Sequence, residues 1–364
     1  MADVTLRRLL RTAIENDASD LHIQAGSPPV LRINGRIHKI ECPPISAEQL
    51  VAFCDLVLDD VTAGILAQEG SCDLAYVLDD RNRFRVNVFT QLSTPALAFR
   101  RLNQRVPTLD ELNLPEALRE IACSRRGLVL VAGMTSSGKS TTIAAMLGYI
   151  NQNFARRIIT IEDPVEYVHT SDRSLVAQID VGHDTRSYED AIRHVLRQDP
   201  NVIMVGEMRD IASIRVALRA ADTGHLVFAT VHATNAQQTV ERIIAMFDPA
   251  QHNLLLTQLA LNVEAVIAMR LAHARAGGRL PVCEIMRGTG TVRKLIHENR
   301  VTAIPQALIN RDCGMQSFDQ HLDDMFKARL ITADEAIRLA SNPESLTMAL
   351  RGFSTRDMAK GLVR

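Results

Sequence analysis

Residues 133–140 (GMTSSGKS) have the types and spacing that bind phosphate, because they match the full pattern G-x-x-x-x-G-K-S. Glycine permits a tight backbone path in such a loop, so several N–H groups and a helix N-terminus can face one anion. We expect Lys139 to reach the β- and γ-phosphates and the Ser140 hydroxyl to ligate Mg²⁺. The predicted nucleotide-binding residues are Gly133, Thr135, Ser136, Ser137, Gly138, Lys139, Ser140 and Thr141. The sequence therefore predicts a protein that binds a nucleoside triphosphate.

Two acidic groups are candidates for the chemistry of hydrolysis. Glu162 and Glu166 follow the apolar run 158–161, and Glu207 follows the apolar run 202–205. Hydrolysis needs one carboxylate that orients and deprotonates water and another that holds Mg²⁺, directly or through water. An acidic residue that ends an apolar strand downstream of the phosphate-binding loop has the Walker B layout. Glu207 is longer than the aspartate usual at this place, which favours a bridging water over direct ligation.

Histidines and arginines complete the set of candidates. His225 and His232 flank the apolar run 226–231, although a histidine beside a strand is more often structural than catalytic. Arginine is needed to neutralise the charge that develops on the γ-phosphate in the transition state. The candidates in the N-terminal part of the chain are Arg83, Arg85, Arg100 and Arg101, and the sequence alone does not choose among them.

The elements that position these groups alternate between strand and helix. The phosphate-binding loop follows the apolar run 128–131 and precedes the stretch 141–150, in which apolar residues recur at helical spacing. This order continues downstream and predicts a doubly wound α/β domain with a mainly parallel sheet. Its chemistry is expected at the carboxyl ends of the strands. The other expected strands are 158–161, 202–205 and 226–231. The expected helices between them are 188–197 and 211–221.

The regions on either side of this domain have different patterns. Alternating apolar residues around Asn34-Gly35 predict a hairpin, and Ser46-x-x-Gln49 fits a capping box, so residues 1–103 read as a small α+β domain. The polar, proline-containing stretch 104–114 is expected to be a linker, 115–290 the α/β domain and 291–364 a helical region. Expected N-terminal strands are 19–23, 30–33, 36–40, 73–78, 83–89 and 96–102, and expected C-terminal helices are 292–298, 318–326 and 334–339.

Composition limits the classes of function. A chain of 364 residues is too long for one ordinary hydrophobic core, which predicts two or three domains. A net charge of −1 with 4% aromatic residues argues against a nucleic-acid partner, since such binders are usually basic and often stack bases on aromatic rings. We see no apolar run long enough to cross a membrane and no signal-peptide core, so a cytoplasmic protein is expected. The six cysteines are scattered, which is typical of buried thiols rather than zinc ligands.

Taken together, these motifs resemble the type IV pilus retraction motors, the PilT and PilU ATPases of the secretion-ATPase superfamily, over nearly the whole chain. Residues 161–167 (IEDPVEY) are similar to the family's Asp box, and 205–210 (VGEMRD) to its Walker B stretch. Residues 223–226 (TGHL) through 230–232 (TVH) are similar to its His box. Residues 19–23 (SDLHI), followed by Gly26, Pro28 and Pro29, resemble its N-terminal opening.

The resemblance implies a PAS-like N-terminal domain, a RecA-like ATPase domain and a hexameric ring. It also implies ATP and Mg²⁺ as the bound groups, with Glu166 as catalytic base and Glu207 as the Walker B carboxylate. His225 and His232 would be the His-box pair, Arg85 and Arg100 would bring cationic groups to the nucleotide, and Ser140, Glu162 and Glu207 would serve the metal. The implied partners are further copies of the chain, an inner-membrane pilus platform protein and a second retraction ATPase. The implied location is the inner face of the cytoplasmic membrane.

The chain departs from the family pattern in two places. Met134 and Ser136 stand where the family usually has Pro and Gly, and we expect Ser136 to have a negative φ because a Cβ is costly in left-handed backbone. Residues 291–298 (TVRKLIHE) match the PilT motif only loosely, whereas 314–320 (GMQSFDQ) are closer to PilU. An accessory PilU-like motor therefore fits as well as a principal one.

Other functions remain as alternatives. Pilus-assembly and type II secretion ATPases usually carry an extra N-terminal domain and a four-cysteine zinc module, neither of which this sequence shows. A nucleotide-binding regulatory subunit that docks on a partner motor is the alternative from a different class. A DNA translocase is disfavoured by the neutral charge.

Overall fold

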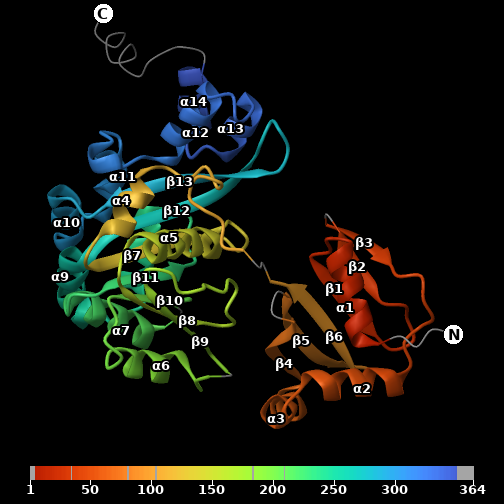
Figure 1. The fold of residues 1–364 in the computed structure, drawn as a ribbon. Coiled ribbons are helices and arrows are strands. Elements are labelled where there is room, and N and C mark those ends of the chain that lie inside the picture. The colour runs from red at the N-terminus through yellow and green to blue at the C-terminus, as the bar shows by residue number, and fades with distance from the viewer. Residues whose placement is uncertain are drawn as a thin grey trace, which may run out of the picture. The chain divides into compact units, whose positions relative to one another are not determined.

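The computed structural model describes residues 5–33, 35–79, 82–102, 105–182, 184–208 and 210–350. The chain divides into two compact units (Figure 1). The N-terminal unit comprises Met1–Arg105 together with two short segments, Asp163–Val168 and Gly182–Asp184. The C-terminal unit comprises the remaining residues up to Arg364.

The N-terminal unit is built on a six-stranded antiparallel sheet in the order β3-β2-β1-β6-β5-β4. Alternate residues of its strands, such as Phe84, Val86 and Val88, are buried against α1 and α2, which is the period-two pattern of a sheet with one covered face. The strands are β1 (Asp20–Gln24), β2 (Val30–Ile33), β3 (Arg36–Lys39), β4 (Ser71–Asp79), β5 (Asn82–Gln91) and β6 (Thr94–Arg101). The helices are α1 (Leu6–Glu15), α2 (Ala47–Val57) and α3 (Asp60–Glu69).

The sequence predicted most of this unit but missed one helix. The expected hairpin is confirmed by the pairing of β2 with β3, although Asn34 of its turn lies outside the described residues. The capping box of α2 is confirmed, since Gln49 N donates to Ser46 Oγ at 3.2 Å and Ser46 N donates to Gln49 Oε1 at 3.0 Å. Helix α3 was missed because none of its side chains is buried, so it has no apolar stripe to recognise.

The C-terminal unit contains a seven-stranded sheet in the order β13-β12-β7-β11-β10-β8-β9 (Figure 1). Neighbouring strands from β12 to β9 are parallel, and only the pair β12 and β13 is antiparallel. This confirms the predicted, mainly parallel sheet. The strands are β7 (Gly127–Gly133), β8 (Arg157–Glu162), β9 (Leu175–Asp180), β10 (Val202–Val205), β11 (Leu226–Val231), β12 (Val263–His273) and β13 (Arg279–Arg287).

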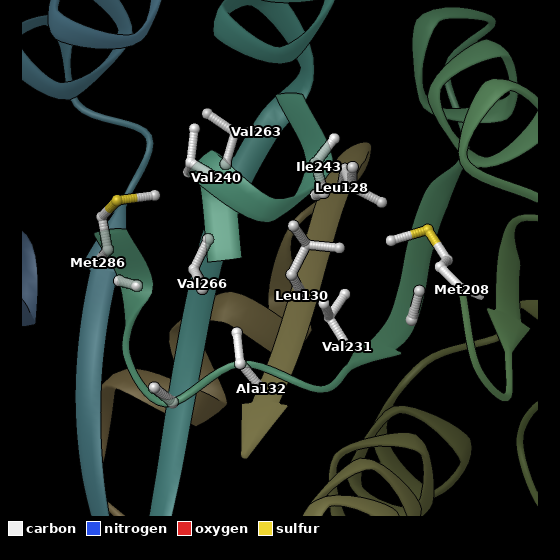
Figure 2. Packing of buried hydrophobic residues seen from close by; sticks show 14 of the residues in the cluster. Leu128, Leu130, Ala132, Met208, Val231, Val240, Ile243, Val263, Val266 and Met286 are labelled. Atoms are coloured by element: carbon white, nitrogen blue, oxygen red, sulfur yellow. The ribbon is translucent and has the colours of Figure 1, made fainter. Parts of the chain in front are cut away.

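Helices cover both faces of this sheet. Leu128 and Leu130 of β7 belong to one buried cluster, and the intervening Val129 and Val131 belong to another, because successive side chains of a strand point to opposite faces. Figure 2 shows Leu128 and Leu130 on the same side as Ile243 of α8. The first face packs against α6 (Tyr188–Val195), α7 (Ile211–Asp222), α8 (Ala236–Ala245) and α9 (His252–Asn262), and the second against α4 (Ala117–Cys123) and α5 (Lys139–Asn153).

The C-terminal helices share the core of this sheet. Phe318 and Leu322 are fully buried in the same cluster as Leu128, and the Arg270 guanidinium of β12 lies 3.9 Å from the centre of the Phe318 ring. The helical character predicted after residue 291 is confirmed up to residue 350, and residues 351–364 lie outside the described residues. The helices are α10 (Gly290–His297), α11 (Ile304–Leu308), α12 (Phe318–Lys327), α13 (Ala333–Leu339) and α14 (Pro343–Leu350).

Strands β9, β12 and β13 of the sheet were not predicted. Strand β12 begins at Val263, directly after α9 ends at Asn262, so no glycine or proline marks the boundary. Strand β9 is half-exposed at the sheet edge and has mixed polarity.

Within the described residues, no helix combines the length and apolar character needed to span a membrane.

Gly288 should be essential for joining the β12–β13 hairpin to the following helix. A Cβ there would lie 2.0 Å from the carbonyl oxygen of Val263, which is backbone and cannot rotate away. We expect Gly288→Ala to lower the free energy of unfolding by about 1–3 kcal/mol or more, the range of overpacking. Gly290→Ala is the matched control, because a Cβ at Gly290 meets nothing within 4 Å. Denaturant titration of both variants checks this, and equal midpoints would contradict it.

Candidate nucleotide-binding site

The phosphate-binding loop connects β7 to α5, as the sequence predicted. Gly133 has φ 156°, and a Cβ on it would lie 2.2 Å from Ser137 Oγ, so only glycine fits. Gly138 has φ 97° and is the N-cap of α5, where the backbone turns into the helix. Because α5 begins at Lys139, the first N–H groups of the helix emerge next to the loop. The loop and the helix N-terminus therefore form the anion-binding arrangement expected of this motif.

Lys139 is folded over the loop that precedes it. Its Nζ donates to the carbonyl oxygens of Gly133 at 2.9 Å and Met134 at 3.0 Å. The residue is only 9% exposed, so its ammonium group lies against the loop backbone and not in solvent. A positive charge in this place complements the phosphate oxygens of a nucleotide.

Ser136 corrects one expectation from the sequence. Its φ is 63°, in the left-handed region, whereas we expected a negative value. The expectation was wrong because it considered only the cost of a Cβ, whereas here the chain has to reverse direction between Met134 and Gly138. Ser137 N donates to Met134 O at 3.2 Å across this reversal. The serine side chain is exposed and short, so the strain is that of the backbone alone.

Three predicted polar residues meet at the edge of the sheet where β7 ends. Glu162 is the last residue of β8, and its Oε1 accepts hydrogen bonds from Thr160 Oγ1 at 2.7 Å and Gln178 Nε2 at 3.1 Å. Glu207 follows β10, and its Oε1 lies 3.0 Å from Nε2 of His232, which follows β11. Since β7, β11, β10 and β8 are adjacent and parallel, their carboxyl ends share one edge with the phosphate-binding loop.

The backbone around Glu207 is fixed by its neighbours on both sides. Gly206 N donates to Ile161 O at 2.7 Å, and Met208 N donates to Thr230 O at 3.0 Å. The Thr230 hydroxyl also donates to Gly206 O. A Cβ on Gly206 would lie 2.8 Å from the Tyr188 hydroxyl, so the glycine allows this close approach. The carboxylate of Glu207 is therefore presented from a rigid turn.

One predicted residue, His225, is not brought to this edge. His225 precedes β11, and its Nδ1 lies 2.9 Å from Ala220 O and 3.1 Å from Thr223 Oγ1. The six residues of β11 separate His225 from the loop-bearing edge, a distance of roughly 20 Å at about 3.3 Å per residue. Glu166 is exposed and lies in the segment Asp163–Val168, which groups with the N-terminal unit.

The two candidate arginines lie side by side in the N-terminal unit. Arg85 of β5 and Arg100 of β6 are direct cross-strand partners. Arg85 Nε lies 3.5 Å from Asp73 Oδ1, and Arg100 Nε donates to Asp20 Oδ1 at 2.9 Å. Burial would raise the pKa of Asp20, but hydrogen bonds from Arg100 and Ser19 outweigh it and the pKa is lowered. The Arg100 side chain remains 69% exposed, so pairing with Asp20 does not enclose it.

Sequence reasoning missed the residues that orient the acidic groups. Thr160, Gln178 and Thr230 all bond to Glu162 or to the turn at Glu207. For Thr160 the available signal was a polar residue within an otherwise apolar run. Thr160 is fully buried, and buried hydroxyls need hydrogen-bond partners. Gln178 had no comparable signal because β9 itself was not recognised.

Comparisons with known proteins find secretion and type IV pilus ATPases that are similar to this chain. A family model described as type II/IV secretion system protein matches residues 2–338. The type IV pilus retraction ATPase PilT of Pseudomonas aeruginosa is 39% identical over 344 residues, 94% of this chain and 99% of PilT. The type IV pilus ATPase PilU of that organism is 38% identical, over 96% of this chain and 92% of PilU. The crystal structure of the pilus retraction motor PilT with bound ADP aligns with a TM-score of 0.87 at 38% identity, covering 94% and 98% of the two chains.

The doubly wound sheet, the phosphate-binding loop and the glutamate after β10 define a P-loop nucleoside triphosphatase. The chain belongs to the type II/IV secretion system protein family, and within it to the type IV pilus ATPases of the PilT and PilU kind. The resemblance read from the sequence is confirmed, and so is the fold class.

The left-handed backbone at Ser136 predicts an order of stability among substitutions. Glycine adopts this conformation without strain, whereas a β-branched side chain is strongly disfavoured there. We expect Ser136→Gly to be at least as stable as the parent and Ser136→Val to be less stable than Ser136→Gly by about 1–2 kcal/mol. Thermal unfolding and nucleotide titration of both variants measure this. A Val variant as stable as the Gly variant would show that the loop does not keep this conformation.

Proposed function

We propose that this chain is an ATP-hydrolysing motor that powers retraction of type IV pili. The observation that carries the proposal is the Glu207–His232 contact at 3.0 Å on the sheet edge that also bears the phosphate-binding loop. The family supplies the kind of work, since PilT is a pilus retraction ATPase. A nucleotide site of this kind converts phosphate hydrolysis into movement when domains respond to the γ-phosphate.

In the proposed site, ATP binds with its phosphates on the loop, and Lys139 turns from the carbonyls of Gly133 and Met134 to the β- and γ-phosphates. Ser140, Glu207 and Glu162 offer the oxygen ligands that Mg²⁺ prefers. Among the described residues no group of three or more His, Cys, Asp or Glu side chains could hold a metal. An NTPase holds Mg²⁺ with few protein ligands together with phosphates and water.

Hydrolysis is proposed to follow water activation by Glu166. The carboxylate takes a proton from water while the water oxygen bonds to the γ-phosphorus, and the bond from that phosphorus to the bridging oxygen breaks to leave ADP and phosphate. His232 would orient Glu207 through their contact. Arg85 and Arg100 are proposed to stabilise the charge on the phosphate in the assembled motor. A role for His225 would have to lie away from the phosphate-binding loop of its own chain.

The assembly, location and domain limits are also part of the proposal. A ring of six chains would transmit force, and each chain would present two different faces to its neighbours. We propose partners at an inner-membrane pilus platform and in a second retraction ATPase, at the cytoplasmic side of the membrane. The proposed domains are residues 1–103, a linker at 104–114, an ATPase domain at 115–290 and a helical region at 291–364.

An accessory motor is supported as well as a principal one. The chain is 39% identical to PilT and 38% to PilU, so identity does not favour either. Steady-state ATPase activity of the isolated protein separates a motor with its own turnover from a regulatory subunit that depends on a partner.

Carboxylate variants test which residue activates water. Removal of a general base blocks chemistry more than binding, so Glu166→Gln should bind ATP with Mg²⁺ and leave it nearly unhydrolysed. Glu162→Gln should instead raise the Mg²⁺ concentration needed for half-maximal turnover, because it removes a proposed metal ligand. Competitive nucleotide titration and single-turnover kinetics measure both effects.

Lys139→Ala provides the reference for this test. It should abolish turnover and weaken nucleotide binding in a folded protein, because it removes the cation on the loop. Normal hydrolysis by Glu166→Gln together with loss in Glu162→Gln would assign the base to Glu162.

Arg100→Ala tests the proposed cation from the N-terminal unit. By analogy with arginine fingers, kcat should fall on the order of a thousand-fold or more while nucleotide affinity changes little. Arg32→Ala is the matched control, because Arg32 Nε also lies close to Asp20, at 3.7 Å. Both variants should lower the melting temperature slightly, but only Arg100→Ala should lower kcat. Equal kcat in both variants would leave Arg100 with a local role only.

A further inference from the structure

The carboxamide of Gln178 bonds to the two residues that flank the segment containing Glu166. Its Nε2 donates to Glu162 Oε1 at 3.1 Å, and its Oε1 accepts from the backbone N–H of His169 at 2.7 Å. Glu162 immediately precedes the segment Asp163–Val168, and His169 immediately follows it. We propose that Gln178 is a positioning residue for hydrolysis, which fixes Glu162 and the ends of the Glu166 segment through one side chain. This inference rests on the proposed function.

The chemistry of the two contacts requires an amide. A backbone N–H can only donate, so the oxygen of Gln178 must face His169. A carboxylate accepts, so the nitrogen of Gln178 must face Glu162. Among side chains of this length, glutamate lacks the donor and leucine lacks both groups. The orientation of the amide follows from its two partners.

Glu162 Oε1 is restrained by two donors that come from neighbouring strands. Thr160 of β8 and Gln178 of β9 are cross-strand partners in the parallel ladder. The Thr160 hydroxyl donates to the same oxygen at 2.7 Å, so the carboxylate cannot rotate without losing both bonds. Positioning groups behind an acidic ligand typically affect activity about 10–100-fold.

The contact with His169 restrains the far end of the segment. Six residues, Asp163–Val168, run between the two restrained positions, and Glu166 is exposed among them. A short connection with both ends held has far fewer conformations than one with a free end. Gln178 thereby restrains both the Glu162 side chain and the segment that carries Glu166.

A second side chain, Asn151, restrains the stretch of chain that directly follows this connection. Asn151 Nδ2 donates to Thr170 O at 2.8 Å, and Asp172 N donates to Asn151 Oδ1 at 3.1 Å. Asn151 is 5% exposed, so its loss should destabilise the fold as well. Asn151→Ala therefore reports what a purely structural tether contributes.

The experiment compares Gln178→Leu with Asn151→Ala. Both should lower the melting temperature, but only Gln178→Leu should lower the single-turnover rate of ATP hydrolysis, by about 10–100-fold, with the ATP affinity unchanged. A rate in Gln178→Leu equal to that in Asn151→Ala would overturn the proposal, because the effect would then be structural.

Gln178→Glu separates the two contacts. It retains an acceptor for His169 N but replaces the donor to Glu162 with a second carboxylate, which repels Glu162, so it should also hydrolyse ATP slowly. In the Glu162→Gln background the same change should cause little further loss, because groups that act through one another are not additive. Additive losses, or normal turnover in Glu162→Gln, would overturn the positioning role.

The parent protein and Lys139→Ala are measured in the same assay. If the parent protein does not hydrolyse ATP with Mg²⁺, the proposed function fails and the inference fails with it. If the parent is active, Lys139→Ala is inactive and Gln178→Leu keeps the parent rate, only the inference about Gln178 fails.

Discussion

Parallel pairing of β7, β11, β10 and β8 is the constraint on which the site depends. Parallel strands place their carboxyl ends at one edge, so the groups that follow them meet although they are far apart in the sequence. The phosphate-binding loop, Glu207, His232 and Glu162 all take their positions from this edge. The strands are almost completely buried between helices on both faces, which fixes their register and hence the relative depth of these groups.

Much of this arrangement follows from local sequence. The glycines and Lys139 of the loop, the apolar strands and the capping box of α2 each depend on residues close together in the chain. Once the strands are known to be parallel, acidic residues at their ends are expected to meet, and Glu162 and Glu207 do lie on the same edge. The position of Glu207 beside His232 could be anticipated in this way, but the distance between them could not.

The features that escaped prediction depend on distant parts of the chain or on backbone conformation. The left-handed Ser136 is imposed by the reversal of the loop, not by any preference of serine. Helix α9 runs into β12 without a break, and pairing with β7 and β13 decides that the second part is a strand. Gln178 belongs to a strand of mixed polarity, so its importance appears only when β9 lies beside β8. His225 and His232 lie at opposite ends of β11, as expected from their positions on either side of the run 226–231.

The packing of the C-terminal helices on β12 has a mechanical consequence. Arg270 and His273 of β12 bond to Leu339 and Glu335 of α13, and the preceding part of β12, Val263–Met269, is paired with β7. A pull applied to these helices would load the β12–β7 ladder in shear, with many bonds strained at once rather than one after another. Strand β7 ends at Gly133, so the load path runs through stiff, buried structure to the residue at which the phosphate-binding loop begins. Tension and nucleotide chemistry would thus act on the same end of β7, because Met269, which directly precedes Arg270, is paired with Gly133.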